Sequence, residues 1–331
     1  MIPYSAPQGA GHIPVIDLAP AFSDALSDRM AVAAEVHRAC RDTGFFFVRN
    51  HRVDAALIAA QFDWARRFFA LPQDAKDAIA LARSPCNRGY EPMGGQTLDS
   101  DTPPDLKEGF YMGWHLEPDH PLVQAGLPNH GPNVWPPALP GFEAQMAAYY
   151  AAMFDLGRRI ARLVALSLEL AENHFDAGFE TPMTILRLLH YPPQPHDAPP
   201  NQLGAGAHTD WGLITILAQD DCGGLEVRNA DGNWLRADPI PETFVVNLGD
   251  MLERWTNGMY HSNLHRVLNR ASRRDRFSVP FFFEPSYHTR VECLPTCTSA
   301  DHPPRYAPCT AGEHIANMYR HTYGGGANLA T

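Results

Sequence analysis

The feature that most constrains the fold is a series of short β-like runs in the C-terminal half of the chain. From Thr184 onward, segments rich in aliphatic, β-branched and aromatic residues alternate with turn signals such as Cys222-Gly223-Gly224 and Asp231-Gly232. Many short strands at this spacing are typical of an antiparallel barrel or jelly roll. The expected strands are 185–191, 205–208, 213–217, 225–228, 244–248, 263–268 and 277–283.

Helical patterns flank this region. Apolar residues at helical spacing predict a helix at 28–43, stopped by Gly44, and another at 54–69, which ends before Pro72. A longer pattern at 142–172 predicts a backbone helix that lies against the sheet. We therefore expect a mainly β fold with flanking helices around a jelly-roll core. The remaining expected elements are strands at 13–18, 45–48 and 107–112 and a helix at 312–323, ended by Gly324-Gly325-Gly326.

One long segment lacks regular patterns. Residues 83–140 are rich in Gly, Pro and Asp, including Gly94-Gly95 and Pro136-Pro137. Long irregular segments in compact proteins are often lids or binding loops. We therefore expect residues 1–140 to form an N-terminal mixed α/β region with substrate-covering loops. Residues 141–331 are expected to hold the long helix, the jelly-roll core and the C-terminal helix.

The composition argues against several classes of partner. The 331-residue chain carries a net charge of −11 and has no basic block, which disfavours nucleic acid and anionic membranes. No window approaches the roughly 18 apolar residues of a membrane span, and residues 1–12 lack a secretory signal pattern. The six cysteines form no C-x-x-C pair, which favours reduced thiols. We expect a cytoplasmic protein that acts on a small molecule and has no obligate protein partner.

A histidine and an aspartate stand two positions apart at the end of an expected strand. On extended chain, His208 and Asp210 project to the same side, where an imidazole and a carboxylate could bind one divalent ion. Such a pair also occurs by chance, so a third ligand has to support it. His261 and His265 compete for that position, because on an extended strand they lie too far apart to bind one ion together.

An anion anchor follows on the next expected strand. Arg276 and Ser278 are again two positions apart, so they share one face while Phe277 turns to the other. An arginine fork beside a hydroxyl matches a carboxylate. Most arginines near strands are simply solvated, but this one opens the apolar run 278–283, which favours a binding role.

Taken together, these motifs resemble those of the isopenicillin N synthase-like Fe(II)/2-oxoglutarate-dependent dioxygenases. The resemblance implies a double-stranded β-helix core and covers nearly the whole chain in the family's order. The matching stretches are 13–18, 44–51, 191–193, 208–210, 223–227, 247–250, 256–258, 262–267 and 276–278.

The same resemblance implies roles for individual residues. It places His208, Asp210 and His265 on iron, and Arg276 and Ser278 on the distal carboxylate of 2-oxoglutarate. Tyr191 matches a family tyrosine near the same carboxylate, and Arg187 on that strand is a further candidate for binding the co-substrate. Leu189 stands where the family has an asparagine, so one contact to the co-substrate differs here.

The implied reaction consumes Fe(II)-bound 2-oxoglutarate and O₂, oxidises a small organic molecule, most simply by hydroxylation, and releases succinate and CO₂. An oxidase or cyclase of the isopenicillin N synthase type, which uses no oxoacid, is the main alternative, because its substrate carboxylate would also fit Arg276. A non-catalytic binding protein and a zinc hydrolase are weaker alternatives. Some segments are also similar to the microbial ethylene-forming enzyme. Trp211 and the Arg320-His321 pair depart from that enzyme, so ethylene formation is not carried over.

The substrate is expected to enter beneath the 83–115 loop and the C-terminal helix. Aromatic residues near these segments are candidates for contacting it, although each by itself is more often a core residue. Several aromatic rings beside an iron site would suit a small organic substrate with an apolar part. The candidates are Tyr90, Phe110, Trp211, Trp255, Phe282 and Tyr319.

Overall fold

The computed structural model describes residues 11–269 and 273–323. Gly324-Gly325-Gly326, expected to end the last helix, lies outside the described residues. The helices are α1 (Leu26–Asp42), α2 (Ala55–Phe69), α3 (Gln73–Asp77), α4 (Pro121–Gln124), α5 (Phe142–Ser167), α6 (Asp250–Trp255) and α7 (Ala311–Tyr323). The strands are β1 (Val15–Asp17), β2 (Phe45–Arg49), β3 (Gly89–Glu91), β4 (Glu108–Gly113), β5 (Ile185–Tyr191), β6 (Ala205–His208), β7 (Ile214–Gln219), β8 (Leu225–Arg228), β9 (Trp234–Arg236), β10 (Phe244–Leu248), β11 (His265–Val267), β12 (Arg276–Phe283), β13 (Arg290–Val291) and β14 (Cys309–Thr310).

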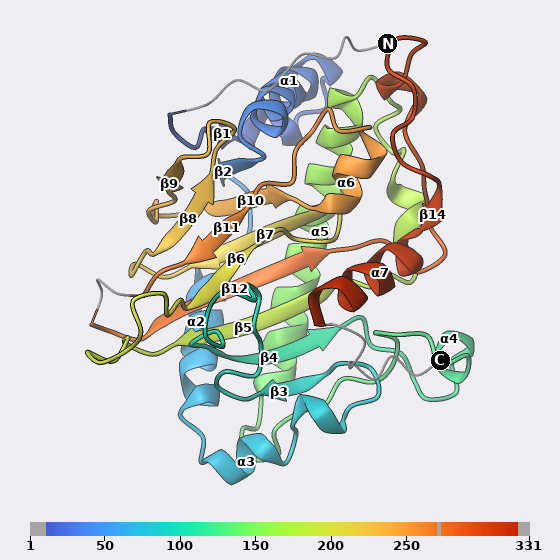
Figure 1. Ribbon diagram of the computed structural model, residues 1–331. Helices are drawn as coiled ribbons and strands as arrows, with labels where there is room; N and C mark the ends of the chain where they lie inside the picture. The colour runs from blue at the N-terminus through green and yellow to red at the C-terminus, as the bar shows by residue number, and fades with distance from the viewer. Residues whose placement is uncertain (1–10, 270–272, 324–331) are drawn as a thin grey trace.

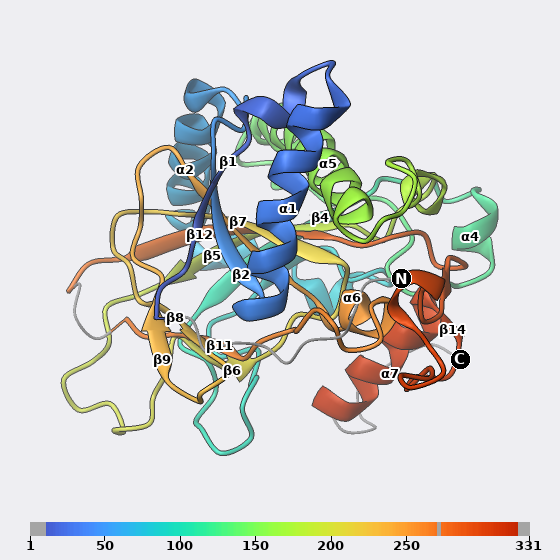
Figure 2. The same ribbon diagram turned by 90° about the horizontal axis from the view of Figure 1, so that it is seen from above.

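Two sheets form the centre of the fold. The larger has the order β1-β2-β10-β7-β12-β5-β4-β3, and the smaller has the order β6-β11-β8-β9. Figure 2 shows α1, α2 and α5 on the outer side of the larger sheet, with the smaller sheet on its other side. α7 lies over the front of the sheets in Figure 1. This arrangement confirms the expected jelly-roll core with flanking helices.

The strand β12 shows why the two faces of the larger sheet differ. Phe277, Val279, Phe281 and Phe283 belong to the core under the helices, while the alternate residues face the smaller sheet. The long helix α5 packs closely on this core, because a side chain at Gly157 would meet the ring of Phe283 at 2.7 Å. The alternation along one strand therefore separates the hydrophobic core from the functional face.

Several element boundaries differ from the sequence expectation. α5 ends at Ser167 rather than at 172, and β11 is confined to His265–Val267, with a register shift between these two residues. β3, β9 and α6 had no clear signal in the sequence, because each is short and is fixed by tertiary contacts rather than by periodicity. The N-terminal strands β3 and β4 lie at one edge of the larger sheet, and β1 and β2 lie at the other edge. A domain boundary near residue 140 stays a prediction.

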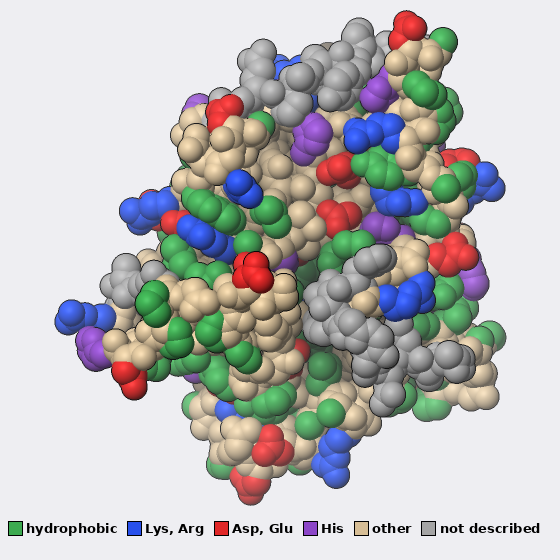
Figure 3. Space-filling view, in the orientation of Figure 1, with side chains coloured by type: hydrophobic (Ala, Val, Ile, Leu, Met, Phe, Trp, Pro, Cys, Tyr) green, Lys and Arg blue, Asp and Glu red, His purple; other side chains and the backbone are tan. Residues whose placement is uncertain are grey.

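Within the described ranges, no helix is both long and apolar enough to cross a membrane. In Figure 3, the Lys and Arg side chains on the visible face are interspersed with Asp and Glu.

A buried polar cluster ties the N-terminal helices to the sheet. The Glu108 carboxylate accepts hydrogen bonds from Tyr90 (2.6 Å) and Lys76 (2.9 Å), and its other oxygen lies 2.7 Å from Nδ1 of His190. Burial raises the pKa of Glu108, but the hydrogen bonds from His190, Tyr90 and Lys76 outweigh burial and hold its pKa below the usual value. The carboxylate is therefore the charged centre of the cluster.

We expect Glu108→Ala to destabilise the protein by roughly 3–5 kcal/mol, because it leaves the buried ammonium of Lys76 without its counter-ion. Urea denaturation measures this change. Asp63→Ala is the matched control, because Oδ2 of Asp63 forms an exposed ion pair with Nη1 of Arg67, 4.0 Å away. Such a pair should contribute about 0–1 kcal/mol to the free energy of unfolding. Equal losses in the two variants would contradict a stabilising role for the Glu108 cluster.

Candidate active site

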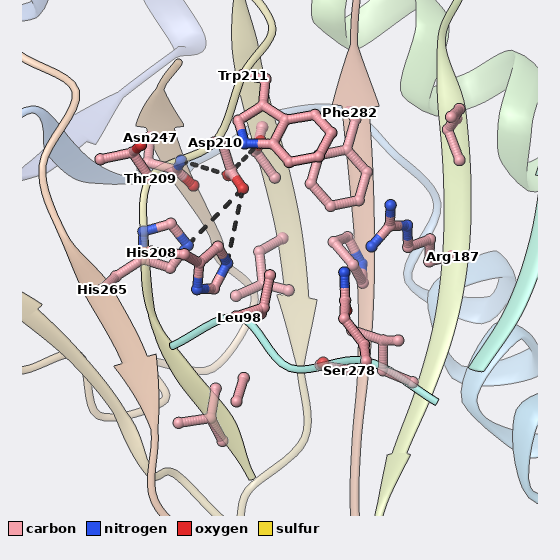
Figure 4. Close-up of a pocket in the computed structure, with 18 of the residues that line it drawn as sticks. Leu98, Arg187, His208, Thr209, Asp210, Trp211, Asn247, His265, Ser278 and Phe282 are labelled. Atoms are coloured by element: carbon pink, nitrogen blue, oxygen red, sulfur yellow. Dashed lines mark hydrogen bonds and ion pairs between the residues drawn. The ribbon is translucent and has the colours of Figure 1, made fainter. Parts of the chain in front are cut away.

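A cavity lies between the two sheets and is closed at one side by α7. Its walls come from β5, β6, β7 and β12, from the segment after β6, and from Ile315 and Tyr319 on α7. We call it the intersheet cavity. Figure 4 shows its central part, with two histidines and an aspartate on one side and Arg187 on the other.

Three of the predicted site residues come together in this cavity. His208 ends β6 and is paired in register with His265, which begins β11, while Asp210 follows β6. Oδ1 of Asp210 lies 3.9 Å from Nε2 of His208 and 3.8 Å from Nε2 of His265. One ligand atom from each of the three residues lies within 4.8 Å of the others. These side chains could therefore hold one metal ion.

Hydrogen bonds aim these groups at a common point. Nδ1 of His208 lies 2.8 Å from the carbonyl oxygen of Gly206. Because a carbonyl oxygen only accepts, Nδ1 carries the proton and Nε2 presents its lone pair to the cluster. His265 is oriented in the same way by the carbonyl of Asn263, at 3.3 Å.

The carboxylate of Asp210 is oriented by two neighbours. Thr215 Oγ1 (2.6 Å) and Asn247 Nδ2 (2.7 Å) both donate to Oδ2, so that Oδ1 faces the histidines. Thr215 was not among the residues singled out from the sequence, and Asn247 appeared only within a matched stretch.

The charges in the cluster suit a divalent cation. Burial, and then the neighbouring His265, lower the pKa of His208 to about 3, so its ring is neutral near pH 7. For Asp210, burial raises the pKa, but His265, His208 and the donors Asn247 and Thr215 hold it below its usual value. The neutral ring of His208 and the ionised carboxylate of Asp210 suit a two-histidine, one-carboxylate iron site.

Arg276 and Ser278 lie deep in the same cavity. Arg276 is 1% exposed and its Nε donates to the carbonyl oxygen of Gly223 at 2.7 Å. Neither Nη1 nor Nη2 has a hydrogen-bond partner among the described residues. The guanidinium carbon lies 4.8 Å from the ring centroid of Tyr191. Because buried donors are rarely left unpaired, these two nitrogens are suited to bind a carboxylate.

Comparisons with known proteins identify the family. Residues 13–138 match the family described as non-haem dioxygenase in morphine synthesis N-terminal, and residues 182–285 match the 2OG-Fe(II) oxygenase superfamily. The 2-oxoglutarate-Fe(II) type oxidoreductase hxnY of Emericella nidulans is 39% identical over 316 residues, which cover 94% of this chain and 90% of the relative. The chain belongs to the 2OG-Fe(II) oxygenase superfamily.

This oxygenase is also similar to solved structures. A full-length protein of Neurospora crassa, solved in complex with alpha-KG, superposes with a TM-score of 0.85 at 28% identity, covering 97% of this chain and all of that chain. The complex of the same Neurospora protein with alpha-KG and thymine has a TM-score of 0.82 and covers 94% of this chain and 97% of the other. The prediction of an enzyme that uses Fe(II), 2-oxoglutarate and O₂ is thereby confirmed.

The structure separates the six aromatic candidates for substrate contact into two groups. Trp211, Phe282 and Tyr319 line the intersheet cavity, and the rings of Trp211 and Tyr319 meet edge to face with centroids 4.8 Å apart. His314 on α7 also lies 2.9 Å from the carbonyl oxygen of Trp211, which fixes the helix over this wall.

The other three candidates lie outside the cavity, and the structure corrects their placement. Tyr90 donates to Glu108 in the buried cluster. Phe110 points to the face of β4 that packs under the helices, where its ring lies against that of Phe68 with the centroids 4.9 Å apart. Trp255 belongs to α6, where its ring packs on Phe175 and its Nε1 lies 3.3 Å from the carbonyl oxygen of Arg290.

Cavity residues that the sequence analysis missed follow the same strand alternation. Lys107 lines the cavity, and its ammonium forms a buried ion pair with Asp105. Glu284 continues the cavity-facing side of β12 beyond Phe282. His261 is not among the cavity-lining residues, and its backbone packs against Gly44. The alternation of side chains along the strands predicts that Lys107 and Glu284 face the cavity.

Proposed function

We propose that this oxygenase hydroxylates a small planar cyclic molecule. His208, Asp210 and His265 hold the iron, and Arg276 and Ser278 bind the distal carboxylate of 2-oxoglutarate beside Tyr191. The iron and co-substrate assignment is carried by one observation: a three-ligand cluster and a buried arginine with two unpaired nitrogens share one cavity. The planar substrate class is inferred from the aromatic walls of that cavity, formed by Trp211, Phe282 and Tyr319.

The positions of the strands support this division of the cavity. Ser278 pairs with Gln219 of β7, whereas Phe282 pairs with Thr215, which hydrogen-bonds to Asp210. The proposed iron ligands therefore lie toward the Phe282 end of β12, and Arg276 lies at its other end. A dicarboxylate that extends from Arg276 to the metal would leave the region around Phe282 for the substrate.

Iron and 2-oxoglutarate in such a site use O₂ to hydroxylate a C–H bond, with one oxygen atom entering the product and the other entering succinate as CO₂ leaves. The protein's own contribution is to hold both reactants in register and to keep the site dry. Asn247 and Thr215 orient the carboxylate ligand, while Trp211, Phe282 and Tyr319 provide apolar walls. Rings on these walls suit a flat substrate, and the similar Neurospora crassa protein binds thymine and 5-formyluracil.

The proposal is tested with protein reconstituted with Fe(II) and supplied with 2-oxoglutarate and O₂. We expect planar cyclic compounds to raise succinate release above the level seen with 2-oxoglutarate alone, in step with a product that has gained one oxygen atom. Mass spectrometry and succinate assays measure the two. Stimulation by acyclic compounds alone would contradict the proposed substrate class, and product formation without succinate would contradict the role assigned to Arg276.

A further inference from the structure

The two ends of the intersheet cavity carry different polar groups. On β5 the residues Ile185, Arg187, Leu189 and Tyr191 face the cavity in turn, and Arg276 of β12 pairs with Tyr191. Arg187 is four residues from Tyr191, which corresponds to roughly 13 Å along a strand. Arg187 therefore lies well away from Arg276, toward Ile185, which pairs with Phe282 on the side of the proposed iron ligands.

Arg187 is held there by aromatic rings. Its guanidinium carbon lies 4.3 Å from the ring centroid of Tyr111 and 4.7 Å from that of Phe282. Stacking between rings fixes the plane of a guanidinium and leaves its edge to donate hydrogen bonds. Figure 4 shows the guanidinium pointing into the cavity below the rings of Phe282 and Trp211.

A buried carboxyl group lies at the same end. Glu284 is 6% exposed and lines the cavity, and its side chain packs against Gly212, where a Cβ would meet Cγ of Glu284 at 2.6 Å. No residue in the described part of the chain donates a hydrogen bond to this carboxyl group; Thr184 interacts only with the backbone of Glu284. Because this carboxyl group lines the cavity, a ligand there can supply the hydrogen-bond donor that the protein does not.

We propose that Glu284 and Arg187 together bind a cyclic amide edge of the substrate, with Arg187 donating to a ring carbonyl oxygen and Glu284 accepting from the adjacent ring N–H. This inference rests on the proposed function, because it places the ring beside the iron ligands. Arg187 belongs to β5 and Glu284 directly follows the neighbouring strand β12. Both line the cavity on the side of the proposed iron ligands, so one ring can meet a donor and an acceptor there. Such a site discriminates strongly against analogues that lack the ring N–H, because the carboxyl group of Glu284 is then left without a donor.

Burial raises the pKa of Glu284 to about 8, against the opposing effect of the cation of Arg187. A protonated carboxyl group still has an oxygen that accepts an N–H, so amide recognition does not require the ionised form. The alternative role for Glu284 is purely structural: it packs against Gly212 and, when ionised, balances the charges of Arg187 and of the fully buried Arg88, whose Nη atoms bond to backbone carbonyls.

The test compares probes and variants in pairs. Thymine and pyridone, each with its N-methylated form, are titrated against wild type, Glu284→Gln and Glu284→Leu, all loaded with Fe(II) and 2-oxoglutarate without O₂. Calorimetry gives the dissociation constants, and thermal unfolding verifies that each variant is folded. Glu180→Gln is the matched control, because Glu180 is exposed and lies outside the cavity.

We expect at least one of the two N–H probes to bind wild type at least about tenfold more tightly than its N-methylated form, and Glu284→Leu to remove that preference. Glu284→Gln should reduce the preference less, because its amide retains an acceptor oxygen, and Glu180→Gln should keep it. Equal binding of methylated and unmethylated probes by wild type would overturn the inference, as would a preference that survives in Glu284→Leu.

Failure of the inference is distinguishable from failure of the proposed function. If wild type releases succinate with other planar rings but ignores the cyclic amides, only the inference falls. If no planar ring stimulates succinate release, the proposed function falls as well. A purely structural Glu284 would lower the unfolding temperature of the leucine variant without changing the ratio of affinities for the paired probes.

Discussion

Asp210→Asn is expected to remove stoichiometric Fe(II) binding and to lower substrate-dependent succinate release by more than about 100-fold. Replacing a residue that merely orients a metal ligand already lowers metal affinity or activity roughly 10–100-fold, and Asp210 is a proposed ligand itself. The structure explains why so small a change should be severe. Thr215 and Asn247 both donate to Oδ2 of Asp210. An amide would place its oxygen toward these donors and its NH₂ group toward the two histidines, where it offers the metal no lone pair.

The measurement combines iron analysis of the reconstituted protein with a succinate assay. Asp221→Asn is the matched control, because Asp221 belongs to the other group of residues with metal-ligand spacing in the described ranges, Asp220, Asp221 and Cys222. Asp220 there bonds to the backbone nitrogens of Cys222 and Phe277, so it has a structural role. Full iron content and turnover in Asp210→Asn would show that the iron is held elsewhere.

The sequence predicted the parts of the site that depend on strand alternation. His208 with Asp210 and Arg276 with Ser278 are pairs at spacing two, and each pair lines the cavity as expected. The sequence could not decide between His261 and His265 without the family resemblance. That choice depends on where β11 begins, and the structure begins it at His265, directly opposite His208.

The aromatic candidates were harder, because a large apolar side chain fits a core and a binding pocket equally well. Phe110 lies on a correctly expected strand, but residues 107 and 110 point to opposite faces of it. Lys107 lines the cavity and Phe110 packs under the helices. Trp255 was misplaced because α6 is too short to show a helical period.

Arg187 shows a different limit. The family resemblance suggested the co-substrate, since Arg187 and Tyr191 belong to one strand. In the pairing of β5 with β12, Arg187 instead lies four residues from the Arg276–Tyr191 pair and two from Ile185, which pairs with Phe282. Its guanidinium carbon lies 4.7 Å from the ring centroid of Phe282. Register between strands is set by long-range contacts, so a local pattern cannot supply it.

Arg276→Lys is expected to raise the KM for 2-oxoglutarate about 100-fold, while turnover at saturating 2-oxoglutarate changes far less. The guanidinium of Arg276 already donates from Nε to Gly223, and the same planar fork keeps two further nitrogens buried and unpaired. A lysine has a single ammonium, which cannot hold the Gly223 carbonyl and also bind a carboxylate through two parallel bonds. Hydrogen bonds to charged groups contribute about 1.5–3 kcal/mol, and a 100-fold change corresponds to about 2.7 kcal/mol.

The split between KM and turnover follows from the distance between Arg276 and the proposed iron ligands, because a contact remote from the reacting atoms stabilises the ground state and the transition state equally. Initial rates of succinate release over a range of 2-oxoglutarate concentrations measure both constants. Arg274→Lys is the matched control, since Arg274 is exposed and pairs with Asp221 at 3.4 Å. A loss of turnover with an unchanged KM would instead place Arg276 at the reacting atoms. An unchanged KM together with full turnover would show that Arg276 does not bind 2-oxoglutarate.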